Sequence, residues 1–196
     1  EAAGVHVLSG VTAGRAAQMN AGARAASGTY LCFLHADTQV PSDFVTLAEQ
    51  VLSDQRTALA GFISVMRGEQ QVRRVTTAHN FIKTWYAPLL FRPVSFFRGA
   101  RLLFGDQVMI CRREDFNSIG GWSITQTIME EADLCLRMVR GGRGRVRQVP
   151  RKVWSSDRRV AKWGFWRANL TFLYVGLMWG FGAPPDRLAR HYEDVR

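Results

Sequence analysis

The first half of the chain alternates short β-prone runs with segments of helical periodicity. Apolar runs at residues 5–8, 29–34 and 58–66 predict strands, and the run at 29–34 lacks alternation, which indicates burial on both faces of a sheet. Apolar positions at helical spacing predict helices over residues 14–27 and 42–52. This alternation of strand and helix favours an α/β fold with a largely parallel sheet.

The second half is less regular and predicts shorter elements. We expect helices at 75–91, 114–119, 131–139, 165–181 and 184–195, strands at 107–111, 145–149 and 153–155, and an Arg/Phe-rich loop at 92–101. The pattern as a whole predicts an α/β domain over residues 1–160, followed by apolar and amphipathic helices over residues 161–196.

The stretch 163–182 is apolar and carries Trp163, Trp166 and Trp179, which makes its relation to a membrane an open question. Arg167 interrupts it, and the uncharged remainder is shorter than the roughly 20 apolar residues that a spanning helix needs. We therefore expect a helix that packs on the domain or on a partner. An interfacial helix is the second alternative and a spanning helix the third.

Charge is distributed unevenly along the chain. Its 196 residues include 26 Lys and Arg and 16 Asp and Glu, for a net charge of +10. Residues 1–136 hold 12 cations and 12 acids, whereas residues 137–167 hold 11 cations and Asp157 alone. Of the 26 cations 23 are arginines, which suit bidentate contacts with phosphate or carboxylate groups.

Composition excludes two classes of protein. With 47% hydrophobic residues the chain can bury a core, so a disordered protein is excluded. Three widely spaced cysteines without a CxxC motif predict buried thiols, which excludes a disulfide framework and a cysteine zinc site. The first residues lack the pattern of a signal peptide.

Two polar motifs flank the predicted strand at 29–34. His35 and Asp37 follow this strand directly, and side chains two apart at a strand end point the same way and can share a divalent cation. The alternative is that Asp37 caps the next turn. Before the strand, Arg15, Gln18 and Asn20 lie at a predicted helix N-terminus, where backbone N–H groups favour anionic ligands.

Two acidic motifs occur later in the chain. Asp106 and Gln107 follow a glycine at the start of an apolar strand and are either substrate-binding residues or turn residues. Glu130 and Glu131 begin a helix, where acids complement the helix dipole. The functional alternative makes one of them a general base whose pKa is raised by its acidic neighbours.

Three segments in a fixed order carry a family resemblance: GRAAQMNAGARAASGTYLCFLHADTQVP, FGDQVMICRREDFNSIGGW and MEEADLCLRMVRGG. In this order they resemble the family 2 glycosyltransferases of the GT-A fold. More narrowly, they are similar to the small bacterial-type transferases associated with radical-SAM and selenium-related domains. The resemblance covers about residues 5–195 and implies a GT-A-like, Rossmann-related, mostly parallel sheet flanked by helices.

The resemblance also implies a reaction and a set of site residues. A sugar would pass from a nucleotide-diphosphate donor to a hydroxylated acceptor, either small or lipid-linked, with inversion. Asp37 with His35 would hold a Mn²⁺ or Mg²⁺ ion on the donor diphosphate. Glu131, beside Glu130, takes the place of the family's catalytic aspartate. The nucleotide pocket would be lined by Arg15, Gln18 and Asn20. The donor sugar or the acceptor would lie against Asp106 and Gln107. The diphosphate would be held by Arg158 and Arg159.

The chain departs from the family pattern at two points. Glu131 is one methylene longer than the usual aspartate, and a shift of roughly 1 Å can cost ~10²-fold in rate. Family members also begin with a strand carrying Pro-x-x-Asn-Glu, which binds the nucleotide. We expect residue 1 to lie after that strand, so that the 1–160 domain is a truncated one.

Other functions stay open alongside sugar transfer. One is a non-catalytic remnant of the same fold that serves as a membrane-associated interaction module. Another is a basic nucleic-acid binder that uses the arginines with Trp154, Trp163 and Trp166. A nucleic-acid-binding function leaves the acidic motifs unexplained, so no nucleic-acid partner is expected. The cations of residues 137–167 instead predict a belt between the site and an anionic membrane, with the protein cytoplasmic and peripheral at the membrane's inner face.

Overall fold

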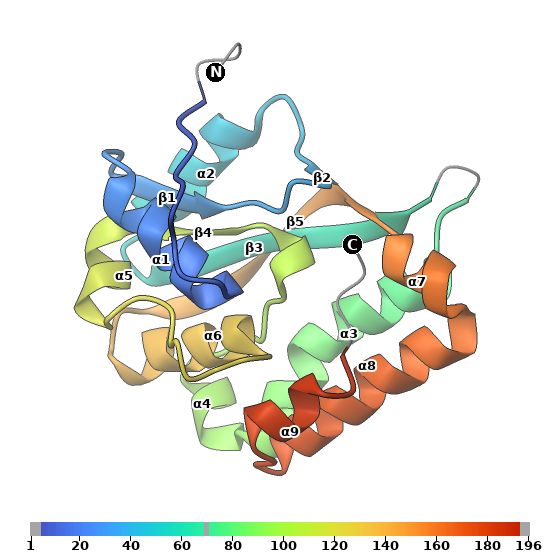
Figure 1. Ribbon diagram of the computed structural model, residues 1–196. Coiled ribbons are helices and arrows are strands. Elements are labelled where there is room, and N and C mark those ends of the chain that lie inside the picture. The colour runs from blue at the N-terminus through green and yellow to red at the C-terminus, as the bar shows by residue number, and fades with distance from the viewer. Residues whose placement is uncertain (1–4, 69–70, 193–196) are drawn as a thin grey trace.

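A computed structural model describes residues 5–68 and 71–192 and shows a mixed α/β architecture (Figure 1). Five strands form a sheet in the order β1-β4-β3-β5-β2. Their bounds are β1 Tyr30–Phe33, β2 Thr38–Gln39, β3 Thr57–Arg67, β4 Met109–Arg112 and β5 Arg145–Ser156. The predicted α/β class is therefore confirmed.

The prediction of a largely parallel sheet is wrong, because the sheet is mixed. Strands β3 and β5 run parallel, whereas β4 pairs antiparallel with both β1 and β3, and β2 pairs antiparallel with β5. After β3 the chain passes through α3 and α4 and returns to insert β4 between β1 and β3. A buried strand reads as a continuous apolar run in either direction, so the local pattern does not reveal this reversal.

Burial along the strands also differs from the prediction. Strand β1 lies at the edge of the sheet, and Tyr30 and Cys32 are exposed, so the expected burial on both faces is wrong for this strand. The strands that are buried along most or all of their length are β3 and β4, in the interior of the sheet. The strand predicted at residues 5–8 is also wrong, because Val5 and Val7 are exposed and the segment pairs with no strand of the described chain.

The helices agree more closely with the sequence pattern. They are α1 Arg15–Ala25, α2 Phe44–Ser53, α3 Arg74–Phe91, α4 Pro93–Phe97, α5 Arg113–Ser118, α6 Glu130–Arg140, α7 Arg158–Trp163, α8 Phe165–Gly180 and α9 Pro185–Ala189, with a 3₁₀ turn at Gly105–Gln107. The loop expected at 92–101 contains α4, and Pro93 at its first position favours that short helix. Helix α9 is shorter than expected, and residues 193–195 of the predicted helix lie outside the described residues.

The two strands predicted at 145–149 and 153–155 are a single strand, β5. Its register against β3 shifts between Val149 and Lys152. Pro150 lies at this irregularity and lacks the N–H group that a regular ladder needs. The sequence break therefore marks a bulge inside one strand.

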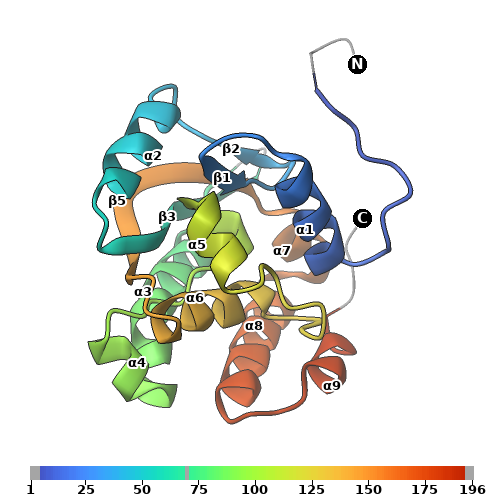
Figure 2. The ribbon, with the colours of Figure 1, turned by 90° about the vertical axis from the view of Figure 1, so that its left-hand side faces the viewer.

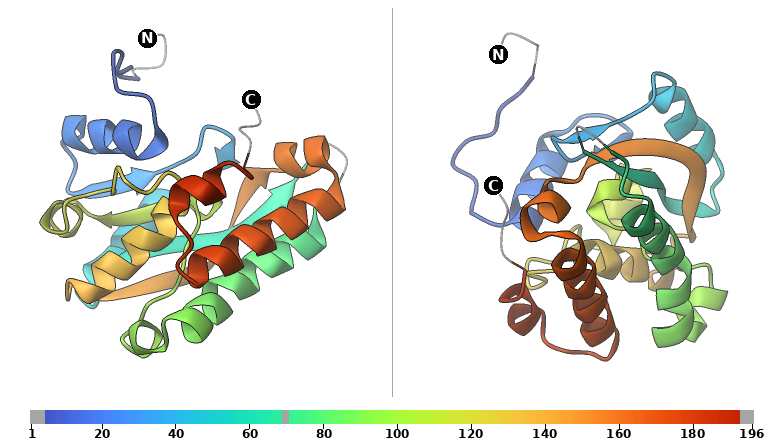
Figure 3. Two further views of the ribbon diagram at one scale, coloured as in Figure 1. Left: turned by 60° about the horizontal axis from the view of Figure 1, so that its bottom comes forward. Right: turned by 90° about the vertical axis from the view of Figure 1, so that its right-hand side faces the viewer.

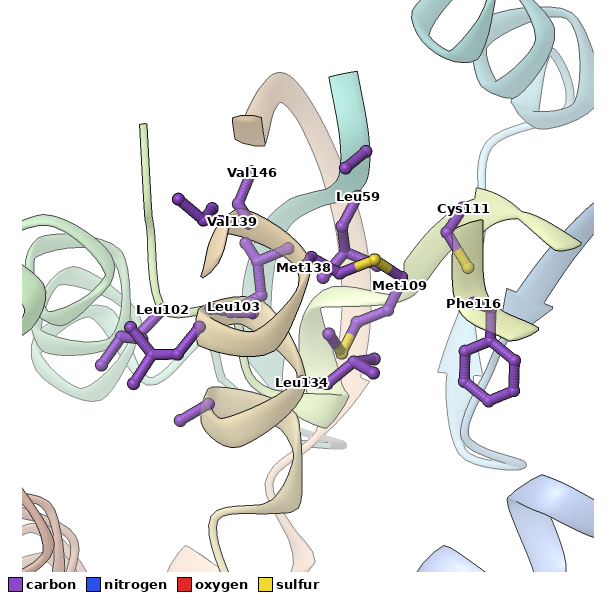
Figure 4. Close-up of a cluster of buried hydrophobic side chains, with 14 of the residues drawn as sticks. Leu59, Leu102, Leu103, Met109, Cys111, Phe116, Leu134, Met138, Val139 and Val146 are labelled. Atoms are coloured by element: carbon purple, nitrogen blue, oxygen red, sulfur yellow. Dashed lines mark hydrogen bonds between the residues drawn. The ribbon is translucent and has the colours of Figure 1, made fainter. Parts of the chain in front are cut away.

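Side chains that alternate along β4 divide the core between the two faces of the sheet. Met109 and Cys111 face the layer that holds Leu134 and Met138 of α6 (Figure 4). Ile110 belongs to the other layer, under α2. Figure 2 shows α2 on one side of the sheet and α6 with α8 on the other. This packing holds the N-terminal end of α6 beside β1 and α1.

The C-terminal helices lie against the same side of the sheet. Helix α8 runs alongside α3, and α9 folds back beside it (Figure 3). A small buried cluster of Ile128, Val175 and Leu188 joins these helices to the segment before α6. Within the described part of the chain, no helix is long and apolar enough to cross a membrane.

Candidate active site

A cavity of about 430 Å³ opens between helix α1, strand β1 and the N-terminal end of α6. Its apolar wall includes Leu31 and Met109 from the sheet. Its polar groups come from three separate elements and are Arg15, Gln18, His35 and Glu131. A largely apolar cavity with a few convergent polar groups is the usual form of a small-molecule site.

Arg15 joins the three elements that surround this cavity. Its Nε lies 3.2 Å from Oε1 of Glu130, and its guanidinium donates a hydrogen bond to Oε1 of Glu131. The same guanidinium lies 3.2 Å from Nε2 of His35. One cation from α1 therefore holds two carboxylates of α6 and the histidine that follows β1.

Both carboxylates of the pair are largely withdrawn from solvent. Glu130 is 2% exposed and Glu131 6% exposed, and Oε2 of Glu130 has no hydrogen-bond partner among the described residues. Burial and the neighbouring Glu131 raise the pKa of Glu130 to about 7, although Arg15 opposes the shift. Met129, just before this helix, has a left-handed backbone (φ 62°), a conformation that L-residues rarely adopt outside functional or strained sites.

Gly105 allows the histidine and the second glutamate to approach each other. A Cβ atom at this position would lie 2.5 Å from Nε2 of His35 and 2.6 Å from Oε1 of Glu131. Any larger residue would displace one of these side chains. The glycine of the Gly105–Gln107 turn is therefore required by the site itself.

Asp106 and Gln107 have different environments from each other. Gln107 is fully buried, accepts a hydrogen bond from the Phe104 amide at 3.1 Å and donates one to Thr84 at 3.0 Å. These contacts use its amide to hold the turn. Asp106 accepts a hydrogen bond from Asn80, and burial raises its pKa.

Lys83 is a site residue that the sequence reasoning missed. Its Nζ lies 3.6 Å from the ring centroid of Phe104. Burial lowers its pKa to about 8, while attraction to Asp106 and Glu131 opposes that shift. The available signal was a single lysine within the apolar helix 75–91.

Gln18 and Asn20 follow Arg15 on α1 but do different things. Gln18 lines the cavity. Asn20 accepts a hydrogen bond from the Trp122 amide at 2.9 Å and donates one to the Trp122 carbonyl at 2.8 Å. Both polar atoms of Asn20 are thus engaged in joining α1 to the segment before α6.

Asp37 lies in a second cavity, of about 770 Å³, which His35 does not line. Arg158 donates a hydrogen bond to its Oδ2 at 2.6 Å, so this predicted pair of site residues is brought together. Arg159 instead bonds the hydroxyl of Tyr192 and lies over its ring at 4.1 Å. The described residues contain no group of three or more His, Cys, Asp or Glu side chains that could hold a metal ion.

Comparison with known proteins gives one finding. The family model for glycosyl transferase family 2 matches residues 1–120, more than half of the chain. No curated protein and no solved structure gives a match. The matched range contains Arg15, His35, Asp37 and the Gly105–Gln107 turn, and it ends before Glu130. The curled mixed sheet with its flanking helices is consistent with a GT-A-like fold. The chain therefore belongs to glycosyl transferase family 2.

Proposed function

We propose that the protein transfers a sugar from a nucleotide-diphosphate donor to a hydroxylated acceptor, with Glu131 as the general base. The observation that carries the proposal is the position of the Glu131 carboxylate on the wall of the 430 Å³ cavity, beside His35 and Gly105 and hydrogen-bonded to Arg15. The guanidinium of Arg15 places a positive charge beside the carboxylate of Glu131, which must be anionic to accept a proton.

The proposed reaction is a single displacement. Glu131 takes the proton of the acceptor hydroxyl while the hydroxyl oxygen bonds to the anomeric carbon. The bond between that carbon and the donor phosphate oxygen breaks, and the nucleoside diphosphate leaves with the electron pair. Attack from the face opposite the leaving group inverts the anomeric centre. Burial and the neighbouring Glu131 raise the pKa of Glu130 to about 7, so we assign the role of base to Glu131 and a supporting role to Glu130.

A divalent cation, Mn²⁺ or Mg²⁺, fits the residues around Asp37. Such ions are commonly held by one or two carboxylates together with substrate phosphates, so a three-residue cluster is not required. Asp37, whose side chain is 32% exposed, would hold the ion, whereas His35 lines the other cavity and has its Nε2 3.2 Å from the Arg15 guanidinium. When bound, the ion supplies Lewis-acid stabilisation of the charge on the departing diphosphate. Arg158, already hydrogen-bonded to Asp37, adds a second positive group at this place.

We further propose that the nucleotide lies against α1, near Arg15 and Gln18, and that the acceptor carries an apolar chain. The apolar wall of the 430 Å³ cavity, which includes Leu31 and Met109, supports this acceptor class. The seam between α3 and α8, lined by Ala87, Leu102 and Leu177, has a free volume of only about 10 Å³ and is too narrow for a hydrocarbon chain.

Turnover of a panel of UDP- and GDP-sugars with Mn²⁺, followed as released nucleoside diphosphate, tests this function. We expect turnover with at least one donor and a loss of tenfold or more in Asp37→Asn. Asp54→Asn is the matched control, because Asp54 caps an exposed turn beside Arg56 and lies outside both cavities. No turnover with any donor, or equal turnover in the two variants, would contradict the proposal and favour a non-catalytic member of the fold.

A further inference from the structure

Helix α3 presents an unusually apolar face to solvent. Its buried residues, such as Thr76, Thr84 and Ala87, lie on one side. The other side carries Ile82, exposed at 52%, and two residues at helical spacing from it, Trp85 at 40% and Leu89 at 46%. Positions three and four apart lie on one face of a helix, so these side chains form a continuous stripe.

Helix α8 carries a second stripe next to the first. Trp166, Leu170 and Leu173 follow each other at intervals of four and three residues and are 74%, 59% and 37% exposed. Leu173 also lines the seam with α3, so this stripe borders that helix. The two helices lie side by side in Figure 3. The surface continues onto α4, where Phe97 is 80% exposed. We call this surface the α3–α8 face, defined by Ile82, Trp85, Leu89, Phe97, Trp166 and Leu170.

The segments that build the α3–α8 face contain cations and no acids. Residues 71–105 hold six Lys or Arg and residues 158–185 hold four, without a single Asp or Glu in either range. The remaining residues hold 16 cations and 16 acids, so these two segments account for the net charge of +10. Two of their cations pair with acids of other segments, Arg73 with Asp157 and Arg158 with Asp37. Another of their cations, Arg101, lies 4.5 Å from the ring centroid of Trp85, directly beside the stripe.

We propose that the α3–α8 face docks on the surface of an anionic lipid bilayer. Apolar side chains of amphipathic helices enter the interface between headgroups and acyl chains, tryptophan favours that depth, and neighbouring cations are attracted to anionic headgroups. A second copy of the chain is a poor occupant, because both copies would bring an excess of cations to the contact and these would repel each other; around Trp85 and Phe97, Asp54 shares one cavity with four arginines, Arg56, Arg101, Arg145 and Arg147. The proposal does not depend on catalysis, since lipid binding needs no turnover.

The cations of residues 137–167 do not form the docking surface by themselves. The structure distributes them over α6, β5, α7 and α8, and acids neutralise several of them. Arg137 pairs with Asp133, and Arg147 and Arg151 of β5 pair with acids near α2. The predicted belt is therefore not one surface, whereas the α3–α8 face combines apolar side chains and positive charge in one place.

Co-sedimentation of the full chain with vesicles tests the proposal. We expect binding to phosphatidylcholine vesicles that contain 30% phosphatidylglycerol and at least tenfold weaker binding to pure phosphatidylcholine vesicles. Leu89→Glu and Leu170→Glu should each weaken binding to the anionic vesicles at least tenfold. Val45→Glu is the matched control, because Val45 is 66% exposed on α2, across the sheet, and the change in charge and side chain is similar.

Three results would overturn the proposal. One is equal binding to neutral and anionic vesicles, and another is an equal loss in Val45→Glu and Leu89→Glu. The third is a concentration-dependent dimer of the parent protein in sedimentation velocity, which Leu89→Glu dissociates, together with no binding of the parent protein to vesicles. Circular dichroism melting checks that the variants fold, which is expected because Leu89 and Leu170 are exposed.

Discussion

Replacing Glu130 by glutamine should stabilise the protein at alkaline pH. Glu130 is 2% exposed, its Oε2 has no hydrogen-bond partner among the described residues, and Glu131 follows it in the same helix turn. Burial and repulsion from Glu131 raise the pKa of Glu130 from its ordinary 4.5 to about 7. An acid with a higher pKa in the folded state binds more protons when folded, so its contribution to stability falls as pH rises from 4.5 through 7.

The size of the effect follows from the shift in pKa. At 1.36 kcal/mol for each pKa unit, a rise from 4.5 to about 7 costs about 3 kcal/mol once Glu130 is ionised. Glu130→Gln keeps the shape of the protonated acid and removes this cost. For a chain of this length, the gain corresponds to roughly 6–12 °C in melting temperature at pH 8.5. At pH 5 the two proteins should differ by less than about 1 kcal/mol.

The assay is urea or thermal unfolding between pH 5 and pH 8.5 for the parent protein, Glu130→Gln and Glu49→Gln. Glu49 is exposed on α2, so its variant should keep the pH dependence of the parent. The stability of the parent relative to Glu130→Gln should decline across this range. Parallel curves for all three proteins, or a less stable Glu130→Gln at pH 8.5, would refute the reasoning.

Other changes test the neighbouring residues. Asn20→Ala removes two hydrogen bonds to the Trp122 backbone and should destabilise the protein by about 2 kcal/mol in urea unfolding, without loss of donor binding. Gly105→Ala places a Cβ 2.5 Å from His35 Nε2 and should lower kcat about 100-fold, whereas Gly176→Ala, with open space around it, should not. Lys83→Met removes a positive charge near Asp106 and Glu131 and should move the acidic limb of the pH–rate profile to higher pH.

Helical elements and the family were predictable because their signals are local. The periodic apolar positions of α2, α3 and α6 fall within a few residues of their predicted ranges. The strong run at β3 is likewise a strand. Strand direction and edge position depend on pairing between distant segments. The apolar run of β1 therefore predicts burial on both faces of a parallel sheet, although β1 lies at an antiparallel edge.

The sequence predicts which residues belong to the candidate site, but it does not predict which of them contact each other. Arg15 and Glu131 are 116 residues apart, and the sequence offers no sign that they form an ion pair. Asn20 has the residue type of a ligand-binding group, yet both its polar atoms bond the backbone of Trp122. Lys83 belongs to no motif, and it is a site residue because α3 crosses behind the Gly105–Gln107 turn.

Single-turnover transfer by Glu131→Gln, measured together with donor affinity, tests the central claim most directly. The glutamine keeps the shape of the side chain but cannot accept the acceptor proton. We predict a rate of sugar transfer at least 10³-fold below that of the parent protein, a donor Kd within about threefold of the parent value, and an unchanged rate in Glu49→Gln. A Glu131→Gln variant that transfers sugar at the parent rate would contradict the role of Glu131 as the base.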